Sequence, residues 1–502
     1  MHRCLPVVGR FFFLAVLAAV SLVANVSRAA VGLTVNPSII TNNFAGKISL
    51  TVTGLTVGKT ITVERFADLN GNGTNDAGEP LVLSFSVTDG QVPQIAGVRN
   101  LNVPGDEDGA TNGQIPAELF FPWVDNVVFS TAVKSIFRVS DPAGGFPSAT
   151  QPFTVVQKVY PQGVTGRITA AATGLPLADT PVALSNPNAP GTRVTVTDTN
   201  GHYTIYSLPG NYVVAVVKDG FISDQSLVVS VGCGQWVTNN LALAGGNLII
   251  AGRVADGSGA GIPGIFISAN STNNLFVATF TDTNGNYVFR VPSNKWRIRP
   301  DKNQPAQLGC VALANRTDVT VTNSSVSNVN FSLPKIEAMI YGTVKDDRNN
   351  PVTGLQLSAQ DYGGQYEARG RTYTTNASYT VGLISGLWPA AGPSTDELAA
   401  RGYTTGTTAF VDTGGGHAFQ YDFTVTRTNL PALGTPVRLS GTQLQFLLSG
   451  MAGQSYTVQA ITNVNGTNWL VVLATNAACD SVTVLDTQAT NSQRFYRAIV
   501  AP

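Results

Sequence analysis

Alternating apolar and polar residues recur along most of the chain, whereas helical periodicity is scarce. The runs at 46–53, 60–66 and 81–87 alternate in this way, which is typical of half-buried strands because successive side chains point to opposite faces of a sheet. A short stretch at 395–401 has a helical pattern. The pattern therefore predicts an all-β protein.

One strand–turn–strand pattern occurs three times in the middle of the chain. The tetrapeptide Asp-Thr-Asn-Gly stands at 198–201 and again at 282–285, and a diverged copy occupies 374–379. Asn-Gly between β-prone runs predicts a hairpin with a type I′ turn, which needs positive φ at both central residues. Recurrence at this long spacing indicates tandem copies of a small domain.

Each copy carries a tyrosine followed nine positions later by a second large aromatic residue. The pairs are Tyr203 with Tyr212, Tyr287 with Trp296, and Tyr379 with Trp388. Paired aromatic residues of this kind most often fill a core. They can also form a flat surface for a ligand, and both interpretations stay open from the sequence.

The order of motifs resembles a known family. A Gly-basic-aliphatic triplet opens two copies, at 166–168 and 252–254, and a small-residue turn, the Asp-Thr-Asn-Gly segment and the aromatic strand follow. This order is similar to that of the carboxypeptidase regulatory-like domain, a sandwich of transthyretin-like topology. The last part of the chain resembles a fibronectin type III-like module. The resemblances imply tandem Greek-key or immunoglobulin-like β-sandwiches in series.

At 502 residues the chain is too long for one hydrophobic core, so several domains are expected. The predicted divisions are a signal peptide at 1–29, an N-terminal β domain at 30–157, repeats at 161–245, 246–335 and 336–430, and a C-terminal module at 431–502.

The N-terminus predicts export from the cytoplasm. Basic residues precede an apolar run at 11–23, and small residues end the leader near Ala29, which is typical of a cleaved secretory signal. We therefore expect a secreted or cell-surface protein with no membrane span after cleavage. Cys233, Cys310 and Cys479 follow the leader, so at most one intramolecular disulfide can form. Formal charge is balanced at 30 basic and 30 acidic residues, which gives no indication of a nucleic-acid surface.

A polar loop between two predicted strands of the N-terminal domain matches the twelve-residue calcium pattern. Oxygen-bearing side chains stand at positions 1, 3, 5, 9 and 12, with glycine at position 6. The predicted ligands are Asp68, Asn70, Asn72, Thr74 through its carbonyl, Asp76 and Glu79. Because strands flank the loop, it resembles the calcium loops of bacterial surface modules more than a complete EF-hand. The alternative is a polar hairpin loop that happens to match.

The chain offers no catalytic motif that we recognise, and we expect no enzymatic activity. The two histidines after the leader, His202 and His417, lie in different predicted domains. Glu337, Glu367 and Glu397 are the remaining candidates for a glycosidase acid pair.

Two non-enzymatic functions stay open from the sequence. One is a structural spacer or adhesion scaffold. The alternative is a carbohydrate-binding protein whose partners are polysaccharides or cell-wall components. A sugar site needs exposed aromatic rings, and Trp236, Trp296 and Trp388 are the candidates.

Overall fold

The computed structural model describes residues 30–44, 46–120, 134–186, 192–373, 375–405, 408–428, 430–491 and 493–500. Strands dominate this part of the chain, and its helices are α1 (Gln304–Gln307) and α2 (Thr395–Ala400). The prediction of an all-β fold is confirmed, as is the short helix near 395–401. Within these ranges no helix has the length and apolar composition needed to cross a bilayer. The predicted signal peptide at 1–29 lies outside the described residues.

The N-terminal domain is a sandwich of two sheets around its own apolar core. One sheet has the order β1 (Gly32–Asn36), β3 (Lys47–Thr53) and β8 (Ile115–Phe120). The other has the order β2 (Ile39–Thr41), β10 (Ala149–Val156), β9 (Lys134–Ser140), β4 (Thr60–Ala67) and β5 (Leu81–Thr88). A small ribbon joins β6 (Gln94–Ile95) to β7 (Val98–Arg99).

The first repeat folds into a second sandwich with a separate core. Its first sheet contains β14 (His202–Tyr206), β11 (Gly163–Ala170), β18 (Trp236–Thr238) and β19 (Leu241–Gly245). Its second contains β13 (Thr192–Val196), β12 (Pro181–Ser185), β15 (Gly210–Val216) and β17 (Val228–Val231). The first strand, β11, pairs in parallel with β18 and β19 at the end of the repeat.

The second and third repeats reuse this plan, each around its own core. The second contains β20 (Leu248–Asp256), β21 (Phe266–Ser271), β22 (Leu275–Phe280), β23 (Asn286–Val291), β24 (Asn294–Pro300), β26 (Thr317–Val321) and β27 (Phe331–Leu333). The third contains β28 (Ala338–Asp346), β29 (Gln356–Gln360), β30 (Tyr366–Tyr373), β31 (Ser378–Leu383), β32 (Gly386–Pro393), β33 (Tyr403–Thr405), β34 (Ala409–Thr413), β35 (Ala418–Gln420) and β36 (Phe423–Arg427). First and last strands again pair in parallel.

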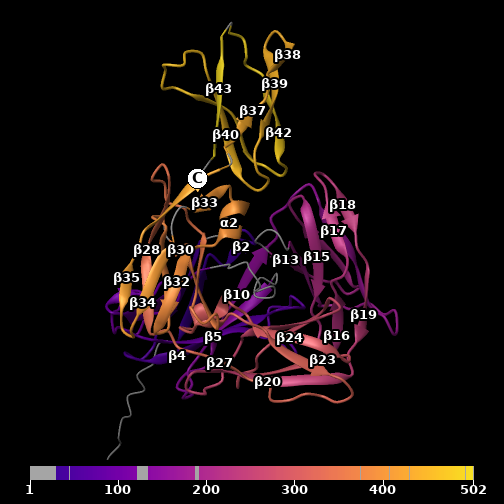
Figure 1. Cartoon of the computed structure of the whole chain (residues 1–502), viewed down its shortest axis with the longest axis vertical. Helices are drawn as coiled ribbons and strands as arrows, with labels where there is room; N and C mark the ends of the chain where they lie inside the picture. The colour runs from indigo at the N-terminus through magenta and orange to yellow at the C-terminus, as the bar shows by residue number, and fades with distance from the viewer. Residues whose placement is uncertain are drawn as a thin grey trace, which may run out of the picture.

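The C-terminal module is a smaller sandwich that stands on top of the other domains (Figure 1). One sheet holds β37 (Ala432–Leu433), β38 (Val437–Ser440), β39 (Gln443–Ser449) and β42 (Ser481–Asp486). The other holds β41 (Leu470–Asn476), β40 (Ser455–Ile461) and β43 (Phe495–Val500).

The repeated tyrosine closes each repeat by bonding to its last segment. Tyr203, Tyr287 and Tyr379 donate their hydroxyls to the carbonyl oxygens that precede the final strand, at 2.7, 2.6 and 2.6 Å. Each of these carbonyls also lies against the glycine that begins the repeat motif. A Cβ added at Gly252, for example, would lie 1.8 Å from Val329 O.

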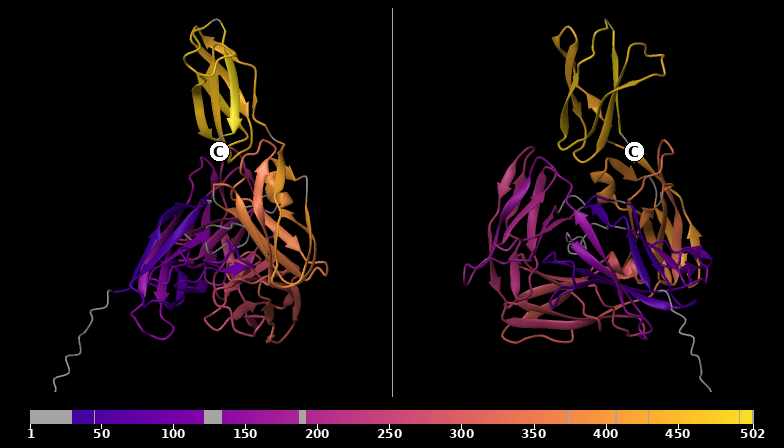
Figure 2. Two further views of the ribbon diagram at one scale, coloured as in Figure 1. Left: turned by 90° about the vertical axis from the view of Figure 1, so that its left-hand side faces the viewer. Right: turned by 180° about the vertical axis from the view of Figure 1, so that it is seen from behind.

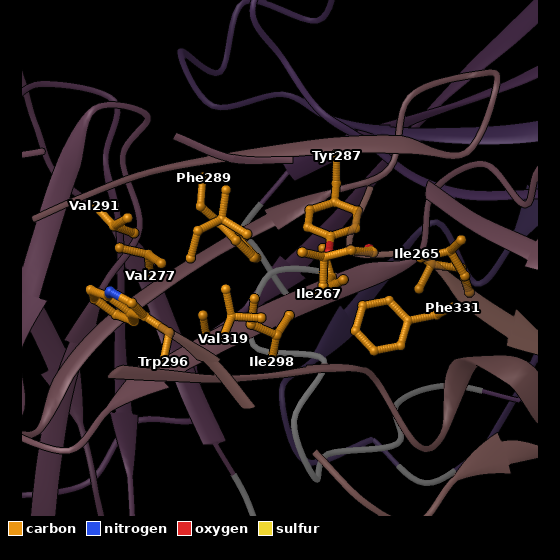
Figure 3. Packing of buried hydrophobic residues seen from close by; sticks show 14 of the residues in the cluster. Ile265, Ile267, Val277, Tyr287, Phe289, Val291, Trp296, Ile298, Val319 and Phe331 are labelled. Atoms are coloured by element: carbon orange, nitrogen blue, oxygen red, sulfur yellow. The ribbon is translucent and has the colours of Figure 1, made fainter. Parts of the chain in front are cut away.

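The second aromatic of each pair is also part of the core. Tyr212, Trp296 and Trp388 are at most 2% exposed. Each donates its polar hydrogen to the backbone carbonyl four residues before it, so no polar group is left unpaired. Figure 3 shows Tyr287 and Trp296 pointing into one core from facing sheets.

The Asp-Thr-Asn-Gly segment is not a hairpin, so that prediction is wrong for the first two repeats. β13 pairs with β12 while β14 pairs with β11, and the segment therefore crosses from one sheet to the other. Asp198 Oδ1 accepts hydrogen bonds from the amides of Asn200 and His202, and Gly201 takes a φ of +77° while Asn200 keeps negative φ. The aspartate thus bends the chain by capping two amides, and a type I′ turn is not formed.

The sandwiches pack against one another and form one body (Figure 2). Strand β16 (Phe221–Asp224) of the first repeat pairs with β22 of the second, and an apolar cluster that includes Ala183 and Phe266 fills the space between them. Strand β25 (Ala312–Leu313) of the second repeat pairs with β30 of the third.

The N-terminal domain and the C-terminal module are also tied to the repeats. Asn102 of the N-terminal domain donates to Thr380 O of the third repeat at 2.8 Å. Gln304 of the second repeat donates to Val82 O at 2.9 Å. A disulfide joins Cys233 of the first repeat to Cys479 of the C-terminal module, across 246 residues of sequence.

Candidate functional site

The predicted calcium loop folds as a compact turn after β4. Its side chains bond mainly to other groups of the loop. Asp76 Oδ2 accepts from the side-chain amides of Asn70 and Asn72 at 2.8 and 2.6 Å, and these bonds lower the pKa of Asp76. Glu79 accepts from the backbone amides of Leu69 and Asp76 at 2.7 and 2.9 Å. The carboxylates therefore fix the shape of the loop.

The donor set of this loop suits a hard cation. Every predicted ligand is an oxygen, as calcium prefers, and Gly73 at position 6 takes a φ of +81°. Asp68 is 4% exposed; its Oδ2 accepts from Gly73 N, while Oδ1 has no hydrogen-bond partner. Within the described residues, however, no three acidic, histidine or cysteine side chains converge closely enough to share a metal. Binding would require the Asn70 and Asn72 amides to turn their oxygens inward.

The loop lies beside the junction of three domains. Leu69, Gly78 and Pro80 line a cavity of about 220 Å³, together with residues of the first and second repeats. The apolar part of its wall comes from residues such as Val217 and Phe280. The loop therefore lies directly next to the contact between these domains.

The three tryptophans that the sequence suggests for sugar binding differ in their exposure to solvent. Trp296 and Trp388 are 0% exposed, so neither ring can stack on a sugar, and the expectation is wrong at these two positions. Both rings are held inside by the core packing described above. Trp236 is 43% exposed and lies on the outer face of the first repeat.

The face around Trp236 combines an aromatic edge with polar side chains. Trp236 packs edge-to-face on Tyr206, with ring centroids 5.4 Å apart, and Gly163 pairs with both residues in the sheet. The alternation of each strand predicts which side chains face outwards, but the sequence does not tell which strands are neighbours. Tyr206 was therefore missed as a candidate.

The three glutamates considered for acid catalysis each have another structural partner. Glu367 of β30 pairs with Arg369 at 2.6 Å and also with Lys302. Glu397 of α2 pairs with Arg371 at 3.5 Å, and Glu337 accepts from the hydroxyl of Ser385 at 2.8 Å. The Lys302–Glu367–Arg369 cluster connects the second and third repeats.

Comparison with known proteins identifies the first repeat. Residues 163–244 match the family model of the carboxypeptidase regulatory-like domain, which confirms the predicted resemblance for that segment. No curated protein sequence matches the chain.

Solved structures that are similar to parts of this chain include two pilins and the Bacillus anthracis TIE protein. The chain is similar to the Bacillus anthracis TIE protein, with 13% identity, 79% of this chain and 75% of that chain covered, and a TM-score of 0.18. A streptococcal ancillary pilin shares 10% identity over 52% of this chain and 98% of its own, with a TM-score of 0.20. The major pilin BcpA of Bacillus cereus shares 10% over 53% and 99%, with a TM-score of 0.13. At these TM-scores the likenesses carry no argument about what this chain does.

The charge of Glu367 should stabilise the contact between the second and third repeats. Burial raises the pKa of Glu367, but Arg369 and Lys302 outweigh burial, so the pKa ends below its usual value. A lowered carboxyl pKa stabilises the fold above the unfolded-state pKa of about 4.3. This contribution is lost as the pH falls through the folded-state value. We expect Glu367→Gln to reduce the free energy of unfolding at pH 7 by about 2–4 kcal/mol, with a smaller difference from the wild type below about pH 4.

Denaturant unfolding at several pH values measures this difference. Glu337→Gln, an exposed change in the same repeat, is the control and should stay within about 0.5 kcal/mol of the wild type. A difference between Glu367→Gln and the wild type that does not depend on pH would show that the carboxylate charge is not what stabilises the contact.

Proposed function

We propose that the protein is a non-catalytic scaffold that is secreted or held at the cell surface, where its packed sandwiches act as a rigid spacer. The observation that carries the proposal is the Cys233–Cys479 disulfide, which connects domains far apart in the sequence. Disulfides of this kind persist in oxidising compartments outside the cytoplasm. They agree with the signal peptide predicted for the N-terminus.

The disulfide gives the scaffold a mechanical property. It links the first repeat directly to the C-terminal module, so a pulling force between the chain ends would bypass the second and third repeats. Beside it, the buried Gln162 donates to Ala478 O at 2.9 Å and accepts from Gly234 N at 3.2 Å. These bonds fix the orientation of the module on the first repeat, as a spacer requires.

Pulling single molecules by their two ends tests this mechanical role. With the disulfide intact, the segment between the two cysteines, whose sequence separation is 246, should not extend. Reduction should release about 80–90 nm of additional length, at about 3.3–3.6 Å per residue. Cys233→Ser should extend like the reduced protein without any reductant. If the extended length of the molecule were equal under oxidising and reducing conditions, the disulfide would not act as a covalent bypass. The main support for the scaffold proposal would then be lost.

We also propose that calcium binds the loop at 68–79 and stiffens this scaffold. Asp68, Asn70, Asn72, Asp76 and Glu79 would hold the ion through side-chain oxygens and Thr74 through its carbonyl. What supports the proposal is the oxygen-only donor set and the buried Oδ1 of Asp68, which lacks a hydrogen-bond partner. The ion would act on the domain junction because the loop lines it.

Calcium titration of the full chain tests the metal proposal. Calcium at one hundred times its dissociation constant should stabilise the folded protein by about 2.7 kcal/mol, seen as a rise in Tm. Asp76→Asn keeps the side-chain shape and should abolish both the calorimetric binding signal and the rise in Tm. Asp347→Asn, an exposed change outside the loop, should leave both intact. Absence of binding heat and an unchanged Tm in the wild type would overturn the proposal.

Carbohydrate binding is the second candidate function. It is favoured by one specific observation, the exposure of Trp236 beside Tyr206 on an open sheet face. Polysaccharides or cell-wall components would be the partners. A scaffold that also binds such a polymer would act in adhesion.

A further inference from the structure

We infer that the outer face of the first repeat, formed by β14, β11 and β18, is a binding site for a chain of neutral hexopyranoses. This inference rests on the second candidate function and gives it a location and a ligand class. Tyr206 and Trp236 form one end of the face, and Arg167 and His202 form the other.

Strand register places the outward side chains in rows. Gly163 lies between Tyr206 and Trp236, and in the next row Thr165 lies between Thr204 and Thr238. One row further, Arg167 pairs with His202. The alternate residues Val164 and Ile168 are buried in the core, so the side chains of these three rows face solvent.

The aromatic end has the shape that stacking on a sugar ring requires. Gly163 has no side chain, and a Cβ added there would lie 3.0 Å from the Trp236 ring. The ring can therefore lie low over the sheet. Tyr206 meets it at an interplanar angle of 77°, which leaves the indole supported from one side and 43% exposed. Such a face offers a flat apolar surface to the C–H groups of a pyranose.

Beyond the tryptophan the face is hollowed and polar. A depression of about 520 Å³ is lined by Thr165, Arg167, His202, Thr238 and Asn240, among other residues. It forms where β11 changes partner from β18 to β19. The hydroxyls can donate and accept hydrogen bonds, as the hydroxyls of a sugar require. An extended chain from Trp236 of β18 to Asn240, just before β19, spans about 13 Å, the scale of a short oligosaccharide.

The charges on this face favour a neutral ligand. The Arg167 side chain donates to Asn200 O at 2.9 Å, and His202 Nδ1 lies 3.8 Å from Asp198 Oδ2. Bonding between Asp198 and the backbone of His202 lowers the pKa of Asp198, with Arg167 adding to the effect. The carboxylate therefore stays ionised beside the guanidinium, and the two charges compensate.

The same face is unsuitable in the other two repeats. The position of Thr204 is taken in the third repeat by Thr380, which is 1% exposed because Asn102 of the N-terminal domain covers it. In the second repeat Ser325 bonds to Ile249 of the first strand, β20. This serine occupies the place that Trp236 has in the first repeat. The first repeat thus combines an open face with an aromatic side chain.

Calorimetric titration of the full chain with cellohexaose, a flat and neutral β-linked hexasaccharide, tests the site. Trp236→Ala should weaken binding about tenfold or more, as truncation of a central aromatic contact does. His202→Ala, at the far end, should weaken it severalfold. Tyr362→Ala removes a 78% exposed aromatic of the third repeat and should leave the affinity unchanged.

The outcomes separate the site from the function. If the wild type and Trp236→Ala bind cellohexaose equally, the site is wrong while carbohydrate binding stands elsewhere on the molecule. If the wild type binds none of cellohexaose, a chitin hexasaccharide and polygalacturonate, both the site and the carbohydrate function are overturned. If it binds polygalacturonate alone, the neutral ligand class is wrong.

Discussion

One backbone carbonyl in each repeat determines how that repeat closes. The carbonyl before the last strand lies over a glycine of the first strand and accepts the hydroxyl of a tyrosine on the neighbouring strand. The first strand, the strand that carries the tyrosine and the segment before the last strand of each repeat are thereby held together at one point. A side chain on the glycine would displace the carbonyl, and loss of the hydroxyl would leave a buried acceptor unpaired. This contact explains why the same glycine and tyrosine recur in all three repeats.

Closed sandwiches of this kind can be combined because their outer faces differ. The third repeat uses one face against the N-terminal domain, whereas the first repeat leaves the equivalent face open. The disulfide then holds the C-terminal module over the first repeat. The scaffold and the sugar site proposed above are therefore compatible, since one uses the contacts between domains and the other uses a face that no domain covers.

The sequence predicted the parts of the structure that depend on local pattern. Alternation identified β3, β4 and β5, and the recurring Tyr287–Trp296 spacing favoured a core pair, which the structure contains. The prediction from sequence failed where the structure depends on contacts between segments that are distant in the chain. Asn200-Gly201 was expected to form a hairpin, but Asp198 caps two amides and the chain crosses between sheets.

For the candidate sugar site, the sequence offered three tryptophans but could not tell which of them were exposed. The sequence does not distinguish Trp236 from Trp296 and Trp388, because the exposure of each ring depends on which strands lie beside its own. The pairing of Cys233 with Cys479 was equally beyond the sequence, because three cysteines left the partner open. The structure shows which residues surround Trp236, such as Tyr206. The proposed ligand class depends on these neighbours.

The most direct measurement of the central claim is the stability of glycine variants of the full chain, followed by calorimetric unfolding. Gly166→Ala, Gly252→Ala and Gly342→Ala each place a Cβ within 2.1 Å of a carbonyl oxygen. Each should lower the free energy of unfolding of its repeat by about 1–3 kcal/mol or more. Gly257→Ala, whose Cβ would lie 3.7 Å from its nearest neighbour, should change it by no more than about 0.5 kcal/mol. If the three variants were as stable as Gly257→Ala, the glycine–carbonyl contact would not be what closes the repeats.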